Sequence, residues 1–142
     1  MKNKIFLVLF IGFLFFFLMS TNGYCAEKWV SFAESEKGDE YYYDASSLKE
    51  VAKRTIQVWR MKKLSALSKT DYITRGKKYD SLASVNTLVE FDCRKMAIKS
   101  LSLVYYDDKG NALESYVNAD ASRRLVRPLS RSELLLNTVC SR

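Results

Sequence analysis

Residues 86–93, NTLVEFDC, alternate apolar and polar side chains in the way that is typical of a β-strand, and the run ends in a cysteine. Because successive side chains of a strand point to opposite faces, Val89, Phe91 and Cys93 share one face. The pattern therefore predicts an apolar platform on which another element packs, with a thiol at its end.

The last residues of the chain have the start signal of an α-helix and carry a second cysteine. Ser130 and Glu133 have the spacing of a capping box, in which each side chain bonds the backbone N–H of the other residue. Leu129 and Leu134 have the spacing of a hydrophobic staple across that start. Apolar residues then recur one turn apart, in the pairs Leu135 with Val139 and Leu136 with Cys140.

A disulfide between Cys93 and Cys140 would join the helix to the strand. A helix of about ten residues is marginal on its own, so packing on the platform and the crosslink are expected to hold it. Closing a loop of this length stabilises the fold by about 4 kcal/mol in the chain-entropy model. Such a bond also requires an oxidising compartment, which implies export.

The rest of the chain reads mainly as strands and turns. Residues 65–81 are polar and charged, and we expect them to form a long, flexible excursion. Residues 36–40 and 107–111 predict turns, and residues 45–49 a turn or a single helical turn. Apolar alternation predicts further strands at 29–33 (WVSFA), 41–44 (YYYD), 54–64 (RTIQVWRMKKL), 96–106 and 112–117.

These elements together predict an α+β fold. Strands that follow one another through short turns favour an antiparallel meander, here of about six strands. The C-terminal helix is expected on one face of that sheet, tethered by the disulfide.

The first residues resemble a secretory signal peptide. Lys2 and Lys4 precede an apolar run over residues 5–19, and small and polar residues follow it. We expect residues 1–25 to be the signal peptide and residues 26–142 to form one domain. Cleavage after Cys25 or Ala26 leaves an even number of cysteines, whereas cleavage after Gly23 leaves Cys25 as a free thiol.

The composition limits the function. The formal net charge is +7, of which the signal contributes two lysines and no acidic residue. An exported basic domain is expected to meet anionic headgroups, polysaccharides or acidic proteins rather than nucleic acid, and peripheral association with the envelope would follow. The chain has no histidine, which excludes Ser-His-Asp triads, Cys-His pairs and histidine metal sites. We expect no cofactor and no enzymatic activity.

Several polar groups have spacings that also occur in catalytic or metal-binding sites. Ser46 and Lys49 have the Ser-x-x-Lys spacing of penicillin-binding enzymes without the companion motifs, so a turn after Asp44 is the expected role. The acidic run 107–111 lacks the full ligand spacing of a calcium loop and predicts a hairpin turn. Glu90 and Asp92 share a strand face, and we expect nearby cations (Arg94, Lys95, Lys99) to neutralise them.

Basic and aromatic residues supply the candidate partner-binding surface. One basic cluster comprises Arg60, Lys62, Lys63, Arg75, Lys77 and Lys78, and the other comprises Arg123, Arg124, Arg127 and Arg131. Arginine forks suit carboxylates, sulfates and phosphates. Alternation within 41–43 turns one or two tyrosine rings outward, which favours a protein interface or a homodimer. The candidate partner-binding residues are Tyr41, Tyr43, Arg123, Arg124 and Arg127.

The order of these features resembles the surface-adhesin protein E-like family. The residues that carry the resemblance are Trp29-Val30, Tyr41–Asp44 with Ala45–Leu48, Ile56–Trp59, Leu88–Cys93, Leu101–Asp107 with Gly110, and Pro128, Ser130, Glu133, Leu134 and Val139-Cys140. The family implies an antiparallel sheet whose C-terminal helix is tethered by this same disulfide. It is named for a bacterial outer-surface adhesin that binds host matrix and serum proteins and can dimerise.

The resemblance has limits that bear on function. The adhesin is a lipoprotein, whereas Tyr24 and Asn22 stand where a lipidation motif before Cys25 needs other residues. Only Cys93 and Cys140 are carried over from the family, and no binding residue is. The expected function is an exported, non-enzymatic binding protein, periplasmic, outer-surface or secreted, for a protein or an anionic polysaccharide. The alternative is a periplasmic structural or accessory protein.

Overall fold

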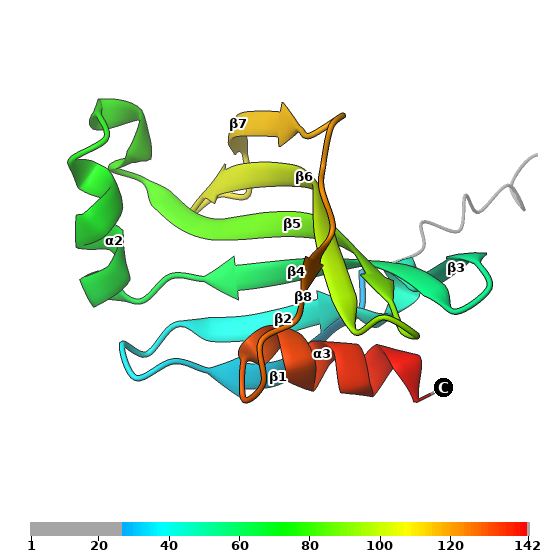
Figure 1. Ribbon diagram of the computed structural model, residues 1–142. Coiled ribbons are helices and arrows are strands. Elements are labelled where there is room, and N and C mark those ends of the chain that lie inside the picture. The colour runs from blue at the N-terminus through cyan, green and yellow to red at the C-terminus, as the bar shows by residue number, and fades with distance from the viewer. Residues whose placement is uncertain (1–26, 142) are drawn as a thin grey trace, which may run out of the picture.

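The alternating runs form the strands of one antiparallel sheet in the computed structural model, which describes residues 27–141 (Figure 1). The predicted signal peptide and Cys25 lie outside the described residues. The elements in chain order are β1 (Trp29–Glu34), β2 (Glu40–Asp44), η1 (Ala45–Ser47), β3 (Lys49–Ala52), β4 (Thr55–Lys63), α2 (Ala66–Ile73), η2 (Lys77–Tyr79), β5 (Leu82–Asp92), β6 (Ala97–Asp107), β7 (Ala112–Val117), β8 (Arg124–Leu125) and α3 (Arg131–Cys140).

The sheet is a meander, as predicted. Six strands follow one another in the order β1-β2-β4-β5-β6-β7, and every neighbouring pair is antiparallel. Two short strands that the sequence did not predict bring the total to eight: β3 pairs with β4, and β8 pairs with β6. The predicted α+β class is confirmed.

The C-terminal helix α3 packs on the face of the sheet that carries Val89 and Phe91, which we call the helix face. These two side chains are fully buried against Leu135 and Val139 of α3. The predicted bond between Cys93 and Cys140 is present, with an S–S distance of 2.03 Å and a Cα–Cα distance of 5.7 Å. The predicted platform, helix and tether are therefore confirmed.

The start of α3 differs in detail from the prediction. Ser130 Oγ accepts a hydrogen bond from the Glu133 N–H, as in a capping box, but the Glu133 carboxylate accepts from the Leu129 N–H instead of the Ser130 N–H. The predicted hydrophobic staple is wrong, because Leu129 is 99% exposed and Leu134 is 53% exposed. Leu129 has a φ of 57°, and this left-handed turn directs the chain away from the staple geometry.

The expectation of a long flexible excursion over residues 65–81 is also wrong. Ser65 caps α2 by accepting from the Ser68 N–H, and Ser68 is itself buried. Tyr79 of η2 packs in a second apolar cluster with Leu64, Leu82 and Val85. Residues 65–81 are therefore a structured segment that packs at one end of the sheet.

The two helices lie apart on the sheet. Figure 1 shows α3 lying in front of β1 and β2, while α2 stands at the end of the sheet away from β3. Among residues 27–141, no helix is long and apolar enough to cross a membrane. The part of the helix face between α3 and α2 is where the structure leaves a hollow.

Candidate binding groove

Strand β4 places two cations on the helix face. Because side chains alternate, Arg60 and Lys62 point to the same face as Val58, which lies in the core under α3. In the neighbouring strands, Arg60 pairs with Tyr43 and Thr87, and Lys62 pairs with Tyr41 and Val85. The helix face of β4 is therefore apolar beneath α3 and basic beyond it, where Arg60 and Lys62 form a basic floor.

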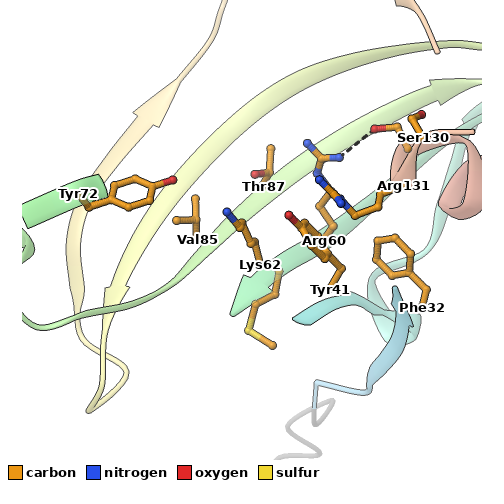
Figure 2. Close-up of a pocket in the computed structure, with 11 residues that line it drawn as sticks. Phe32, Tyr41, Arg60, Lys62, Tyr72, Val85, Thr87, Ser130 and Arg131 are labelled. Carbon is orange, nitrogen blue, oxygen red and sulfur yellow. Dashed lines mark hydrogen bonds between the residues drawn. The ribbon is translucent and has the colours of Figure 1, made fainter. Parts of the chain in front are cut away.

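A groove of about 340 Å³ lies over this basic floor. Figure 2 shows Tyr72 of α2 on one side of it and Ser130 and Arg131 at the start of α3 on the other. The residues that line it are Phe32, Tyr41, Arg60, Met61, Lys62, Tyr72, Val85, Thr87, Ser130, Arg131 and Ser132. We call this hollow the arginine groove.

Two further hollows adjoin the arginine groove. One, of about 330 Å³, shares Ser130 and Ser132 with it and adds Arg124 and Arg127. The other, of about 520 Å³, shares Tyr41, Lys62 and Arg131 with it. This third hollow also contains the acidic residues Glu34, Glu36, Asp39 and Asp71. The surface between the helices is therefore basic at one end and mixed at the other.

The guanidinium of Arg60 is the least solvated cation of the groove. Its Nη1 donates a hydrogen bond of 3.3 Å to Ser132 Oγ. Burial, together with the positive charge of Arg124, lowers the pKa of Arg60 below its usual value. Since an arginine stays charged in proteins, the guanidinium of Arg60 keeps its charge in a poorly solvated place, where the positive charge of the exposed Arg124 also acts on it.

The other arginines of the surface also lack an acidic partner. Arg131 lies over the ring of Tyr41, with its Cζ 4.6 Å from the ring centroid. Within residues 27–141, no carboxylate forms an ion pair with any of the four arginines Arg60, Arg124, Arg127 and Arg131. A site of this kind favours an incoming anion that can accept from several guanidinium groups.

Lys62 differs from these arginines because it is compensated within the chain. Its Nζ lies 2.8 Å from Asp39 Oδ2, and the Asp39 carboxylate also accepts from the Ser65 N–H and the Ser68 hydroxyl. Burial alone would raise the pKa of Asp39, but these hydrogen bonds outweigh it and hold the pKa well below its usual range. Lys62 therefore links the groove floor to α2 and offers less free charge to a ligand.

The opposite face of the sheet carries its own ionic cluster. Glu90 is buried and accepts from Arg123 at 2.6 Å, from Gln57 at 2.8 Å and from Lys99 at 3.2 Å. Burial opposes ionisation, but these three partners together lower the pKa of Glu90. Arg123 also lies 3.5 Å from Asp92. The acidic pair is neutralised as expected, although by Lys99 and Arg123 rather than by the side chains of Arg94 and Lys95.

Two other motifs of the sequence form ordinary turns. Ser46 donates to Asp44 from both its backbone N–H and its hydroxyl, so it shapes the turn of η1. Asp107 accepts from the N–H groups of Lys109 and Asn111 in the hairpin before β7. Among the described residues, no group of three or more acidic or cysteine side chains is arranged to hold a metal ion.

The structure brings together some of the predicted partner-binding residues and separates others. Tyr41, Arg124 and Arg127 line the connected hollows. Tyr43 lies on the same face as Tyr41 but is only 4% exposed, because α3 covers it, so its expected outward orientation does not hold. Arg123 lies on the opposite face, occupied by Glu90 and Asp92.

Two groove residues were absent from the predicted partner-binding set. The sequence placed Arg60 and Arg131 in two separate basic clusters, and the fold brings both to one groove. One signal for Arg60 was available in the sequence, namely its position two residues after the apolar Val58 on an alternating strand. Nothing local indicated that Arg131 lines the same groove, because its position depends on how α3 docks.

The comparisons with known proteins agree with this architecture. The sequence profile of the family described as Surface-adhesin protein E matches residues 29–141. The chain belongs to the surface-adhesin protein E family. A search of curated proteins finds no match.

Solved structures of Haemophilus influenzae protein E share the fold. Crystal form II of that protein matches with a TM-score of 0.52 at 13% identity, covering 80% of this chain and 87% of the other. Protein E from non-typeable Haemophilus influenzae matches with a TM-score of 0.53 at 13% identity, covering 81% and 85%. At such low identity these matches establish the fold alone, whereas the family match supports a surface-adhesin-like role and a location outside the cytoplasm.

Proposed function

We propose that this protein is an exported, non-enzymatic adhesin-like domain that binds an anionic partner through the arginine groove. The observation that carries the proposal is that the four arginines of the arginine groove and of the hollow next to it have no carboxylate partner among residues 27–141. Arg60 is poorly solvated, whereas Arg124, Arg127 and Arg131 are exposed and open to an incoming anion, so a ligand that supplies the negative charge is expected to stabilise the set. Family membership supports the adhesin-like part of the proposal.

Export is the part of the proposal that rests on the sequence. The residues of the predicted signal peptide, 1–25, and the bond between Cys93 and Cys140 both favour a destination outside the cytoplasm. The destination itself, periplasm, outer surface or medium, is part of the proposal. Intact mass of the exported protein, with and without reductant, tests cleavage and the fate of Cys25.

Binding can be tested with a variant of the groove and a variant matched to it in charge. The groove variant is Arg60→Gln, Arg124→Gln and Arg131→Gln, and the control is Arg94→Gln, Lys95→Gln and Lys109→Gln, three exposed positions in the turns of the sheet. Both remove three positive charges. We expect the wild type and the control to bind an immobilised basement-membrane extract, and the groove variant to lose most of that binding.

Equal binding by the groove variant and the control would overturn the proposal. Absence of binding by the wild type would do so too, and a pull-down from the protein's own cell envelope would then test the accessory role. Melting curves of both variants by circular dichroism show whether each is folded when its binding is measured.

A further inference from the structure

The chemistry of the arginine groove narrows the class of partner, and this inference rests on the proposed function. We propose that the groove binds a sulfated polysaccharide, whose sulfate groups are held by Arg60, Arg124 and Arg131. Nothing in the family match or in the structural matches names such a ligand. The following observations favour it over an acidic peptide.

Among the cations that line the arginine groove and the two adjoining hollows, those without an acidic partner are all arginines, since Lys62 and Lys37 are paired. A guanidinium is planar and weakly hydrated, and its paired N–H groups match two oxygens of one sulfate. Arg60 and Arg131 line one hollow, and Arg124 lines the hollow that continues from it past Ser130 and Ser132. Donors spread over two joined hollows fit a chain that carries an anionic group on successive units better than one isolated anion.

Aromatic rings line the same groove. Phe32 and Tyr41 have ring centroids 6.3 Å apart, and Tyr72 lines the groove from α2. Arg131 lies over one face of the Tyr41 ring and Arg75 over one face of the Tyr72 ring, so the sugar would use the remaining ring surfaces. The face of an aromatic ring carries partial negative charge, so it attracts cations and polarised C–H groups and disfavours anions. A sulfated sugar offers both an anionic group for the guanidinium groups and a C–H face for the rings.

The floor of the groove does not offer the backbone contacts that a peptide uses when it binds as an added strand. The floor is the face of β2, β4 and β5, where each strand is paired on both sides over Tyr41, Lys62 and Val85 or their neighbours. A peptide that binds by strand addition gains much of its affinity from main-chain hydrogen bonds to an exposed sheet edge, and this floor has none. A polysaccharide has no such requirement, because its contacts come from hydroxyl, sulfate and ring C–H groups.

The acidic residues of the third hollow limit the length of the ligand. Asp39 and Asp71 are paired with Lys62 and Lys37, whereas Glu34 and Glu36 form no ion pair among the described residues. A uniformly anionic chain is repelled there, so it is expected to extend toward Arg124 and Arg127 instead. A short oligosaccharide should therefore bind the groove with about the same affinity per groove as a long chain does.

A fluorescent heparin-derived octasaccharide tests the inference on the purified protein, in about 0.15 M NaCl where surface charges are screened beyond about 8 Å. We expect saturable binding, a loss of at least about tenfold in affinity for the groove variant, and a change of less than about twofold for the control. Removing the sulfates from the octasaccharide, while keeping its carboxylates, should weaken binding to the level of the groove variant. If the groove variant does not fold, Arg131→Gln alone at the exposed start of α3 serves in its place.

Four results would overturn the inference. Binding that the groove variant retains would place the octasaccharide elsewhere on the protein. Equal competition by a deca-glutamate peptide, or equal binding of the desulfated octasaccharide, would assign the groove to carboxylates. Absence of octasaccharide binding, while binding to the basement-membrane extract still depends on the groove, would refute the ligand class and leave the proposed function standing.

Discussion

The two helices that flank the arginine groove are held to the sheet in different ways. Helix α3 buries Leu135, Leu136 and Val139 in the main core, and a disulfide joins its last residue to Cys93, directly after β5. Helix α2 exposes its apolar residues Leu67 and Ile73, and its first turn is held by hydrogen bonds to Asp39. One side of the groove thus depends on apolar burial and a covalent bond, whereas the other combines the packing of Tyr72 against the second apolar cluster with hydrogen bonds to one ionised carboxylate.

This difference implies that the two sides of the groove respond to different perturbations. Apolar burial and a disulfide do not change with pH, whereas a carboxylate loses its role as an acceptor of several hydrogen bonds when it is protonated. The groove should therefore keep its α3 side under acid conditions in which its α2 side loosens.

The largest expected effect comes from breaking the tether of α3. Cys93→Ser and Cys140→Ser should each lower the free energy of unfolding by about 4 kcal/mol, because the bond closes a long loop. The separation of the two cysteines is 47 residues. Urea unfolding followed by circular dichroism measures the loss. The double variant should be no less stable than either single variant, since one bond is removed in every case.

Additive losses in the double variant would contradict a bond between these two cysteines in the native protein. The wild type unfolded in the presence of reductant is the matched control, because it removes the bond without changing a side chain. Its stability should agree with that of the two serine variants.

The next largest effect on stability is expected at α2, the side of the groove that Asp39 holds. Asp39→Asn should lower local stability at α2 by about 2 kcal/mol, because the amide cannot replace a carboxylate that accepts from Lys62, Ser65 and Ser68. Hydrogen exchange of the α2 amides measures this change, and the α3 amides are the internal control. Equal acceleration of exchange in both helices would mean that Asp39 supports the whole fold and not one side of the groove.

The same carboxylate predicts a pH dependence of α2. The pKa of Asp39 is lowered in the folded state, so its contribution is fully present above the unfolded pKa of about 3.8 and is lost as the pH falls below that value. Exchange of the α2 amides should accelerate below this pH, after correction for intrinsic rates, while that of α3 should not. The Asp39→Asn variant should lack this dependence, and its persistence in the variant would assign it to another group.

The contrast between the two sides of the groove also explains what the sequence could and could not predict. Helix α3 was predictable, because its cap, its apolar repeat and its cysteine are all local signals within Ser130–Cys140. Helix α2 was not, because Leu67 and Ile73 form no buried face and the residue that fixes it, Asp39, lies 26 residues before Ser65. A long-range polar contact of this kind leaves no periodic pattern in the chain.

The candidate site shows the same limit. Alternation placed Tyr41 and Tyr43 on one face, but only the docked position of α3 decides that Tyr43 is covered and Tyr41 is not. In the same way, the basic run before the helix predicted a partner-binding surface but could not separate Arg123 from Arg124. Arg124 is the first residue of β8 and pairs with Ile98, whereas Arg123 directly precedes that strand and pairs with Glu90 and Asp92 on the other face, and neither pairing is visible in the sequence.

The smallest expected effects on stability come from these two neighbouring arginines. Arg123 is paired with Glu90 and Asp92 on the face opposite the helices and is about half exposed, with 40% of its side chain accessible. Arg123→Gln should therefore lower the free energy of unfolding by up to about 1 kcal/mol and leave binding to the basement-membrane extract unchanged. Arg124 is exposed and has no carboxylate partner among residues 27–141. Arg124→Gln should change stability by less than about 0.5 kcal/mol and weaken binding.

The two variants remove the same charge from adjacent positions, so net charge cannot account for a difference between them. Thermal and urea unfolding report the first effect, and binding to the immobilised extract reports the second. If both variants weaken binding equally, the partner responds to overall positive charge and not to the groove. If Arg123→Gln alone weakens it, the binding surface is the opposite face of the sheet. Loss confined to Arg124→Gln means that an arginine contributes to binding here only where the fold leaves it without an acidic partner.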